Sequence, residues 1–379
     1  MHSRRTKTIG KDTHKAAART LSLGLLWAAL LGILLSNSAQ AASRLVFPRP
    51  VALEPNIDFW VDVFSAYSER DFVVHDRDQV WKIYQVLHIP GDGSPSPTDV
   101  DWAKGYLKAK WSDALHHLAT GAEPVGAEER VAARLFSGES LWAYEVAAQN
   151  LRVQQGLRER FREAILRSRN YSSTMERIFR AAGLPVELTM LPHVESGFVN
   201  TSRSSAGAVG IWQFTRSTGK QYDLKITRRM DQRLDPYRET EAAAKLLRYN
   251  YEVLGNWPLA ITAYNYGTYG MAQAAEAFAS DFSKVFKRFN GPHFGFASKN
   301  YYAEFLAALQ VHDYEDAYFP GIAAEPTPPP QVVRVMLPAP ARSHRHQPGG
   351  RTARASRATH RKHRQAQTAG KAKSALPPT

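Results

Sequence analysis

Apolar side chains recur at helical spacing through most of the middle of this chain, and this periodicity limits what the chain can fold into. Between residues 100 and 180 the pattern is amphipathic, with apolar positions that include Leu151, Val153, Leu157, Phe161, Ile165 and Leu166. The alternation of apolar and polar residues that is typical of strands is nearly absent there. Residues 181–315 have the pattern of short helices separated by glycine-rich turns. The sequence therefore predicts an all-α protein.

Before residue 100 the sequence predicts a helix, a loop and the start of a second helix. Apolar positions in the range 59–67 fall at helical spacing. The run IPGDGSPSPTD, residues 89–99, is dense in Gly, Pro and Ser, so we expect a loop there. Thr98 or Asp99 is a candidate cap for the helix that follows.

The N-terminal end has the order of a secretory signal peptide. Basic residues are followed by an uncharged apolar run from Leu21 to Leu35, and then by small residues at Ala39 and Ala41. This order predicts export and cleavage after Ala41. An uncleaved membrane anchor is the alternative, but the run is about 15 residues long, whereas a membrane span needs about 20. We expect an exported protein, periplasmic or associated with the cell envelope.

The net charge of +14 comes from the two ends of the chain. The N-terminal end carries six basic residues and one acid, and the part from Arg334 onward carries eleven basic residues and no acid. The middle is left with a charge of −2. A nucleic-acid-binding protein would carry its basic residues on the folded part, so this class is disfavoured.

The C-terminal end, residues 319–379, is rich in Pro, Arg and His and contains few large apolar residues. Such a segment buries too little apolar surface to offset the entropy of ordering, so we expect a disordered basic tail. Its charge could hold the protein against anionic polymers of the cell envelope or, peripherally, at a membrane. A tail that only solvates the protein is the alternative.

The chain contains no cysteine, which excludes disulfides, thiolate metal sites, a nucleophilic Cys and a lipid-modified Cys. The sequence HVE at 193–195 has the form of the H-x-E motif of zinc deaminases, but that site also needs a C-x-x-C motif. We expect no metal site and no cofactor.

Glu195 is the residue that most directly suggests chemistry. It lies in the segment GLPVELTMLPHVESGFVNTSRSSAGAVGIWQF, residues 183–214, on one helical stripe with Leu188, Leu191 and Phe198. Burial on an apolar face disfavours the charged form of a carboxyl group and raises its pKa. Glu195 is therefore a candidate general acid for a glycosidic oxygen. Pro192 interrupts the helix, and a Glu at a helix end that faces solvent is the alternative.

A glycine turn follows in the same segment. Gly207 and Gly210 permit tight backbone and the close approach of a ligand, and they precede Trp212 and Gln213. Gln213 can donate to and accept from sugar hydroxyls or an N-acetyl group, and Trp212 could line a sugar subsite. A core Trp beside a surface Gln is the alternative.

The third segment is NWPLAITAYNYGTYG, residues 256–270. Its helical pattern carries Tyr264 and Asn265 into a turn at Gly267. A phenol and an amide there could orient a carboxyl group or the substrate. A core Tyr and a capping Asn are the alternative.

Local signals predict the helix boundaries around this segment. Asp235 suits a turn or cap ahead of a helix that starts near Thr240, and Gly255 is expected to end that helix. Pro258 suits the first turn of the next helix.

Together these segments resemble the lysozyme-like soluble lytic transglycosylase family, and most closely its membrane-bound murein transglycosylase D branch. The matching elements are LPHVESGF, AGAVGIWQF, AYNYG and SKNYYAEFLAA, with the lead-in sequences FPRPVALEPNIDFW and RSRNYSSTMERIFRAAGLP. The lipid-anchoring Cys and the lysin-motif repeats that the branch often carries are not visible here. The expected parts are a signal peptide (1–41), a helical N-terminal extension (42–170), a lysozyme-like catalytic domain (171–318) and the tail (319–379).

The resemblance implies roles for individual residues. Glu195 would be the catalytic acid and base, and Ser196 and Tyr264 would hydrogen-bond and orient Glu195 or the substrate. The residues implied to contact sugar in the cleft are Gln213, Asn265, Tyr301 and Trp212. The implied reaction cleaves the bond between N-acetylmuramic acid and N-acetylglucosamine in peptidoglycan. It closes a 1,6-anhydro ring without consuming water, and is therefore a lyase reaction.

Two other functions are compatible with the sequence. Ordinary glycosidases use two carboxyl groups, and the acids nearest to Glu195 in the chain lie outside any motif-like setting; they are Glu187, Asp223, Asp231 and Asp235. A single carboxyl group suits an intramolecular nucleophile, although folding could bring another acid near. A lysozyme-type hydrolase of the same fold is the nearest alternative. A non-catalytic peptidoglycan-binding or scaffolding protein is the second.

Overall fold

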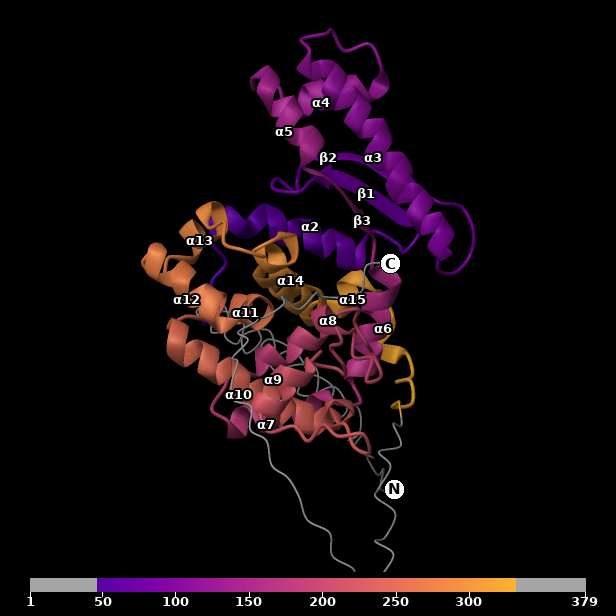
Figure 1. Ribbon diagram of the computed structural model, residues 1–379. Coiled ribbons are helices and arrows are strands. Elements are labelled where there is room, and N and C mark those ends of the chain that lie inside the picture. Colours follow the sequence, from indigo (N-terminus) through magenta and orange to yellow (C-terminus); the bar gives the residue numbers. More distant parts are fainter. Residues whose placement is uncertain (1–45, 332–379) are drawn as a thin grey trace, which may run out of the picture. The chain divides into compact units, whose positions relative to one another are not determined.

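The computed structural model describes residues 46–331 of the chain (Figure 1). The chain divides after Arg49 into two compact units, and the elements below belong to the unit that begins at Pro50. The expected signal peptide, its cleavage after Ala41 and the basic part of the tail lie outside the described residues. Within the described range, no helix is both long enough and apolar enough to span a membrane.

Three strands form an antiparallel sheet in the order β2-β1-β3; they are β1 (Asp71–Asp76), β2 (Ile83–His88) and β3 (Leu151–Gln155). Because the sequence predicted only helices in this region, the sheet is a correction. The central strand β1 has the sequence DFVVHD and is buried almost throughout, on both faces. It therefore lacks the alternation of apolar and polar residues by which a half-buried strand is predicted. β3 has five residues, which is too short for its period to separate a strand from a helix.

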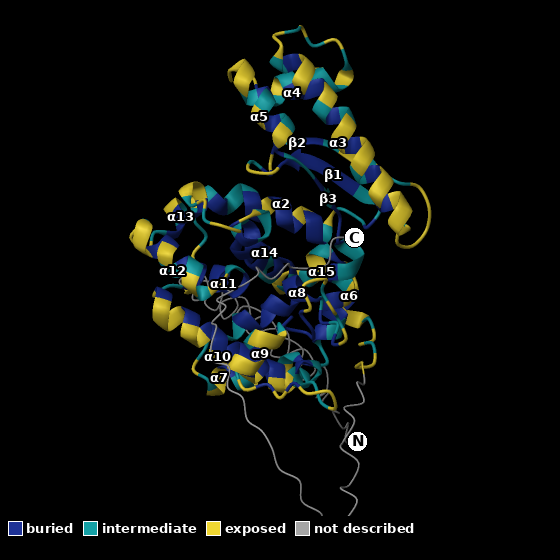
Figure 2. Ribbon diagram, viewed as in Figure 1, coloured by how far each residue is buried: buried dark blue, intermediate teal, exposed yellow. Residues whose placement is uncertain are grey.

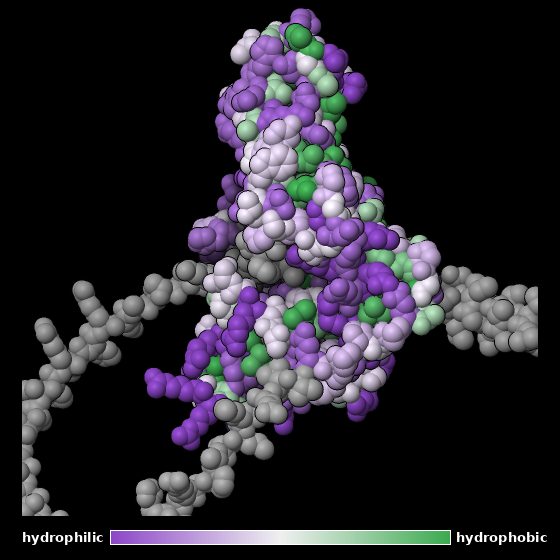
Figure 3. All heavy atoms as spheres, turned by 90° about the vertical axis from the view of Figure 1, so that its right-hand side faces the viewer, coloured by the Kyte–Doolittle hydropathy of each residue, from purple (hydrophilic) through white to green (hydrophobic). Residues whose placement is uncertain are grey.

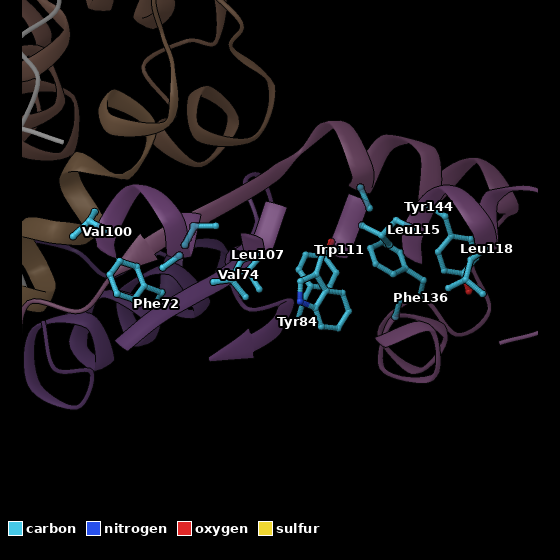
Figure 4. Close-up of a cluster of buried hydrophobic side chains, with 14 residues drawn as sticks. Phe72, Val74, Tyr84, Val100, Leu107, Trp111, Leu115, Leu118, Phe136 and Tyr144 are labelled. Atoms are coloured by element: carbon cyan, nitrogen blue, oxygen red, sulfur yellow. The ribbon is translucent and has the colours of Figure 1, made fainter. Parts of the chain in front are cut away.

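Helices α3 (Pro97–Ala119), α4 (Ala127–Leu135) and α5 (Leu141–Gln149) pack with the sheet around a core of their own (Figure 4). Trp111 of α3 lies against Tyr84 of β2, with ring centroids 5.2 Å apart. The indole N–H of Trp111 donates to Oε1 of Gln85 over 3.1 Å. The indole ring of Trp111 is thus buried, and its only polar group, the N–H, has a hydrogen-bond partner.

The loop expected at residues 89–99 is present, but α3 begins inside it, at Pro97. Ser96 is the N-cap: its hydroxyl oxygen accepts from the backbone N–H of Asp99, whose carboxylate accepts in turn from the backbone N–H of Ser96. This reciprocal arrangement is a capping box. The expected cap at Thr98 or Asp99 was therefore misplaced, because both residues lie in the first turn of the helix.

The other elements form a helical body. They are η1 (Val51–Leu53), α2 (Glu54–Ser65), α6 (Arg158–Ser168), α7 (Ser172–Ala181), η2 (Val186–Met190), α8 (Leu191–Glu195), α9 (Arg216–Gln221), η3 (Gln232–Leu234), α10 (Pro236–Leu254), α11 (Trp257–Tyr266), α12 (Thr268–Ala277), α13 (Phe282–Arg288), α14 (Phe296–Asp313), α15 (Glu315–Tyr318) and η4 (Ile322–Ala324). Helix α14 is the centre of this body, and α2, α8 and α11 pack against it. Figure 2 shows α14 buried along most of its length. The chain is mostly helical, as expected.

Helix α2 joins the expected extension to the part of the chain that follows residue 170. Nδ2 of Asn56 in α2 donates to Oδ1 of Asn300 in α14 over 2.8 Å, and both side chains are buried. The region expected as one extension, residues 42–170, therefore has two parts. Helices α2 and α6 belong to the helical body, and the sheet with α3, α4 and α5 is inserted between them.

The helix boundaries read from local signals in the third segment are confirmed. Asp235 is the N-cap of α10, and its carboxylate accepts from the N–H groups of Tyr237 and Arg238. Gly255 ends α10 with a φ angle of 74°, which favours glycine. Pro258 lies in the first turn of α11. Only the start of α10 differs, since the helix begins at Pro236.

The first part of the segment that was expected to be a disordered tail is ordered in the structure. Residues 319–331 have a defined course, in which Ile322 of η4 is buried and Nδ2 of Asn170 donates to the carbonyl oxygen of Pro328 over 2.8 Å. Arg162 of α6 also pairs with Glu325, and Arg169 donates to the carbonyl oxygen of Ile322 over 3.1 Å, so polar contacts hold this stretch beside α6.

The face in Figure 3 is largely hydrophilic, and its hydrophobic residues form small, separate patches.

Candidate active site

Glu195 is the last residue of α8, a short helix that follows η2. Pro192 lies in the first turn of α8, where its missing N–H has no helical partner to lose, so it starts this helix instead of interrupting it. The chain then turns sharply, with φ angles of 57° at Gly197 and 59° at Phe198. The side chain of Glu195 is 1% exposed. Its expected burial is confirmed, although the helix ends before Phe198.

Two tyrosines from distant parts of the chain meet at Glu195. The hydroxyl of Tyr301 in α14 donates to Oε1 of Glu195 over 2.6 Å. The ring of Tyr264 in α11 lies nearly parallel to that of Tyr301, with centroids 6.4 Å apart and planes inclined by 7°. Burial, followed by the charge of Glu195, raises the pKa of both phenols well above its ordinary value. Both phenols therefore stay protonated and keep their capacity to donate.

The remaining predicted residues of the first and third motifs connect the site to its neighbours. The hydroxyl of Ser196 donates to the carbonyl oxygen of Ile211 over 2.8 Å, which joins the turn after Glu195 to the glycine turn. The hydroxyl of Tyr264 donates to the carbonyl oxygen of Trp212 over 2.8 Å. Asn265 is buried, and its Oδ1 accepts from Ser298 of α14. The three motifs thus lie together in the folded chain.

Trp212 and Gln213 are both buried in the structure. The indole of Trp212 is 0% exposed, stacks on Phe179 and donates from Nε1 to Oγ1 of Thr240 over 2.9 Å. The amide nitrogen of Gln213 donates to the carbonyl oxygen of Gly210 over 2.7 Å. Trp212 is therefore a core residue, as in the alternative interpretation, and does not line an open subsite. It supports the glycine turn from behind.

Gly210 is required by the tight packing of this turn. Its φ angle is 90°, a conformation that L-residues avoid. A Cβ added at Gly210 would also overlap the carbonyl oxygen of Arg233 and the carboxyl group of Glu239. Gly207 has a φ angle of 79° but open space around it. The two glycines therefore differ in packing while sharing backbone conformation.

We expect Gly210→Ala to lower the free energy of unfolding by about 3 kcal/mol or more, because a steric clash adds to the cost of the positive φ angle. Gly207→Ala is the matched control, and it should cost only about 1–2 kcal/mol for the backbone conformation. Urea denaturation of both variants measures the difference. Equal losses of stability in the two variants would contradict this account of the turn.

Three of the four acids considered from the sequence have partners elsewhere in the structure. Asp223 pairs with Lys245 over 2.7 Å and Asp231 with Arg233 over 2.7 Å, while Asp235 caps α10. Two acids that the sequence analysis missed are buried in the site region instead.

Glu239 is the first of these acids. It is fully buried in α10, and its Oε2 accepts from the backbone N–H of Trp212 over 3.2 Å. Its charge also contributes to the raised pKa of Tyr264, after burial and the charge of Glu195. Glu239 therefore holds the glycine turn against α10. The sequence signal for it is weak, because Glu239 lies in a helix with many other polar residues.

Glu304 is the second. It lies three residues after Tyr301 in α14 and is 5% exposed. Burial raises its pKa to about 8; the positive charge of Arg152 opposes this rise and the charge of Glu195 adds to it. A second buried carboxyl group is therefore present in the region of the site, a possibility that the sequence analysis had left open. Helical spacing from Tyr301 was the signal that could have found it.

A cavity of about 250 Å³ lies beside the turn after Glu195. Its lining includes Phe64, Arg160, Phe161, Arg167, His193 and Ser196. Nε of Arg167 donates to the carbonyl oxygen of Gly197 over 2.8 Å, which holds the turn in place. Burial, followed by the charge of His312, holds the pKa of His193 well below its ordinary value, so His193 is neutral near pH 7. The cavity thus combines aromatic and cationic walls.

Part of the chain that builds this site matches a known domain family. Residues 176–286 match the family model described as "Transglycosylase SLT domain". The matched range contains Glu195, Ser196, Gln213 and Tyr264 and ends before Tyr301. Among residues 46–331, no group of three or more His, Cys, Asp or Glu side chains is placed to hold a metal ion.

Particular proteins are similar to parts of this chain. The membrane-bound lytic murein transglycosylase D of Escherichia coli (strain K12) is 40% identical over 106 residues, which are 28% of this chain and 24% of that protein. A protein of Alteromonas sp. (strain M-1), named for tributyltin chloride resistance, is 35% identical over 85 residues, or 22% of this chain and 41% of its own. The structure of an inactive mutant of lytic transglycosylase Slt from Pseudomonas aeruginosa covers 40% of this chain and 25% of that one, at 20% identity and a TM-score of 0.32. This chain therefore spans about a quarter of the length of the E. coli relative.

Proposed function

We propose that this protein is a peptidoglycan lytic transglycosylase with Glu195 as its general acid and base. The observation that carries the proposal is the buried carboxyl group of Glu195, which accepts a hydrogen bond of 2.6 Å from Tyr301. The match of residues 176–286 to the Transglycosylase SLT domain supports it. So does the similarity to a protein named lytic murein transglycosylase D.

The proposed reaction has two proton transfers, both through Glu195. First, protonated Glu195 donates to the oxygen of the β-1,4 bond between N-acetylmuramic acid and N-acetylglucosamine, and the bond from C1 to this oxygen breaks. The departing sugar leaves as an alcohol, and positive charge develops at C1 of the muramoyl residue. Then the carboxylate of Glu195 takes the proton of the muramoyl C6 hydroxyl, whose oxygen bonds to C1. The 1,6-anhydro ring closes, Glu195 is protonated again, and no water is consumed.

The other residues are proposed to orient these groups. Tyr301 holds the carboxyl group of Glu195 and stabilises its charged form, and Tyr264 packs against Tyr301. Ser196 fixes the turn after Glu195. Gln213 and Asn265 are buried as well, and we propose that they contact sugar through their amide groups, which carry both donors and acceptors. For Trp212 we propose a supporting role only, because its single polar group already donates to Thr240.

We also propose that the protein acts outside the cytoplasm, in the periplasm or at the cell envelope, where peptidoglycan is found. The order of residues 1–41 supports export. The basic residues beyond Arg334 are proposed to attract anionic envelope polymers. The E. coli relative carries "membrane-bound" in its name.

A lysozyme-type hydrolase remains the second candidate, and one observation favours it. Hydrolysis by an ordinary glycosidase needs a second carboxyl group, and Glu304 lies near Glu195. Against this, burial raises the pKa of Glu304 to about 8, so Glu304 is largely neutral near pH 7. The second carboxyl group of an ordinary glycosidase must be charged to act as base or nucleophile.

The masses of the products decide between these functions. Purified peptidoglycan is digested with the protein lacking residues 1–41, and the released muropeptides are weighed by mass spectrometry. We expect fragments lighter by one water than fragments with ordinary reducing ends, because an anhydro ring has formed. Ordinary reducing ends would establish the hydrolase. No release by a folded sample would instead favour a binding or scaffolding protein.

A further inference from the structure

We propose that Glu304 forms an electrostatic pair with Glu195, and that Arg152 from strand β3 of the inserted sheet controls the charge of this pair. Glu304 is a positioning residue in this proposal, because it acts on the reaction only through Glu195. The inference rests on the proposed role of Glu195 and adds to it a contribution from the inserted sheet.

The first step is the position of Glu304 on α14. Tyr301 and Glu304 are three residues apart in this helix, so their side chains lie on neighbouring positions of one face. The hydroxyl of Tyr301 reaches Oε1 of Glu195 over 2.6 Å. Both Tyr301 and Glu304 are buried. The carboxyl group of Glu304 is therefore buried one helical turn away from the contact that holds Glu195.

The second step is the placement of Arg152. This residue lies in β3, opposite His75 of β1, and its guanidinium group lies 3.9 Å from the centre of the Phe296 ring at the start of α14. Its Nε–H is buried without a hydrogen-bond partner in the described part of the chain. Placing a cation there is costly. The ring of Phe296 offsets part of that cost, and any negative charge that develops on Glu304 would offset more of it.

The third step is the charge that each group carries. Burial lowers the pKa of Arg152; a negative charge on Glu304 opposes this change, and the positive charge of Arg77 adds to it. His75 is neutral near pH 7, because burial lowers its pKa to about 4. Glu304 is acted on by Arg152 and Glu195, and its pKa of about 8 means that it is largely protonated near pH 7. The pair of carboxyl groups thus holds at most one negative charge under these conditions.

This charge state suits the proposed reaction. Glu195 becomes a carboxylate when it donates its proton, and a neutral Glu304 does not repel the new charge. Above the pKa of Glu304, a second negative charge opposes the ionisation of Glu195. Coulomb repulsion acts equally on both members of the pair, so each carboxylate holds the proton on the other. Arg152 sets the pH at which this second charge develops.

Titration of Glu304 tests the proposal without requiring turnover. Carbon-13 NMR of glutamate labelled at the carboxyl carbon follows Glu304, whose signal is assigned by its loss in Glu304→Gln. In the unchanged protein, we expect Glu304 to titrate near pH 8. In Glu195→Gln, the removal of a negative neighbour should lower this pKa by about one unit. In Arg152→Gln, the removal of a positive neighbour should raise it.

The control is Asp313→Asn, which removes an exposed acid from the same helix and should leave the titration of Glu304 unchanged. The pH dependence of kcat/KM adds a second measurement. In Glu304→Gln its alkaline limb should fall at a lower pH, because no second carboxylate holds the proton on Glu195. The same titration of Glu304 in the unchanged protein and in both test variants would overturn the proposal. Absence of glycan cleavage together with the expected shifts would refute only the proposed function.

Discussion

Glu195→Gln is expected to reduce the release of muropeptides by about 10³-fold or more, because general acid and base action is removed from both proton transfers. Glutamine has nearly the shape of glutamate and still accepts the hydrogen bond of Tyr301. We therefore expect the variant to fold normally and to retain its affinity for glycan strands. Initial rates on purified peptidoglycan measure the loss, and sedimentation with insoluble peptidoglycan measures binding.

The matched control is Glu187→Gln, in which the same change is made eight residues earlier in the same segment. Glu187 lies in η2 and is partly exposed, so its neutralisation should leave turnover near that of the unchanged protein. Near-normal turnover in Glu195→Gln would refute the mechanism. A similar loss in both variants would point to damage of the segment as a whole.

Tyr301→Phe is expected to lower kcat by about 10- to 100-fold with little change in KM. Its hydroxyl donates to the group that becomes charged in the reaction, and a hydrogen bond to a charged group contributes about 1.5–3 kcal/mol. Loss of this hydrogen bond raises the barrier of the step in which Glu195 becomes a carboxylate. Steady-state kinetics on soluble glycan fragments separates the effect on kcat from that on KM.

Tyr302→Phe is the control for this prediction, since it removes the hydroxyl group of the next residue of α14. Tyr302 is also fully buried, and its ring packs edge-on against Phe282 with centroids 5.2 Å apart. We expect kcat to stay near its normal value in this variant. A drop in Tyr302→Phe as large as that in Tyr301→Phe would show that hydroxyl loss in α14 acts through stability and not through Glu195.

Features that depend on a few neighbouring residues could be predicted from the sequence. Gly255 and Pro258 set the end of one helix and the start of the next because their backbone conformations are restricted. The apolar neighbours of Glu195 predicted its burial, because a side chain on an apolar stripe faces the core. The family motifs predicted Tyr264 and Tyr301 as site residues, and the structure places both beside Glu195.

Features that depend on contacts between distant residues could not be predicted in this way. β1 is separated from β3 by three helices and β2, and nothing local marks their pairing. The role proposed for Arg152 depends on the position of β3, which places its guanidinium group at the start of α14. The sequence was compatible with Trp212 in a sugar subsite and with Trp212 in the core. The contacts that place it in the core are with Phe179 and Thr240, which lie far from it in sequence.

The inserted sheet has a consequence for how such a molecule can change during evolution. The chain enters the sheet through β1 and leaves it through β3, and these strands are neighbours, with the N–H of Gly156 donating to the carbonyl oxygen of Asp71 over 2.8 Å. Whatever lies between them can lengthen, shorten or be replaced without moving the helices that hold Glu195. A lineage could therefore exchange this part as a module. Arg152 lies in β3, so an exchange that included this strand would also change the charge placed beside the carboxyl groups of the helical body.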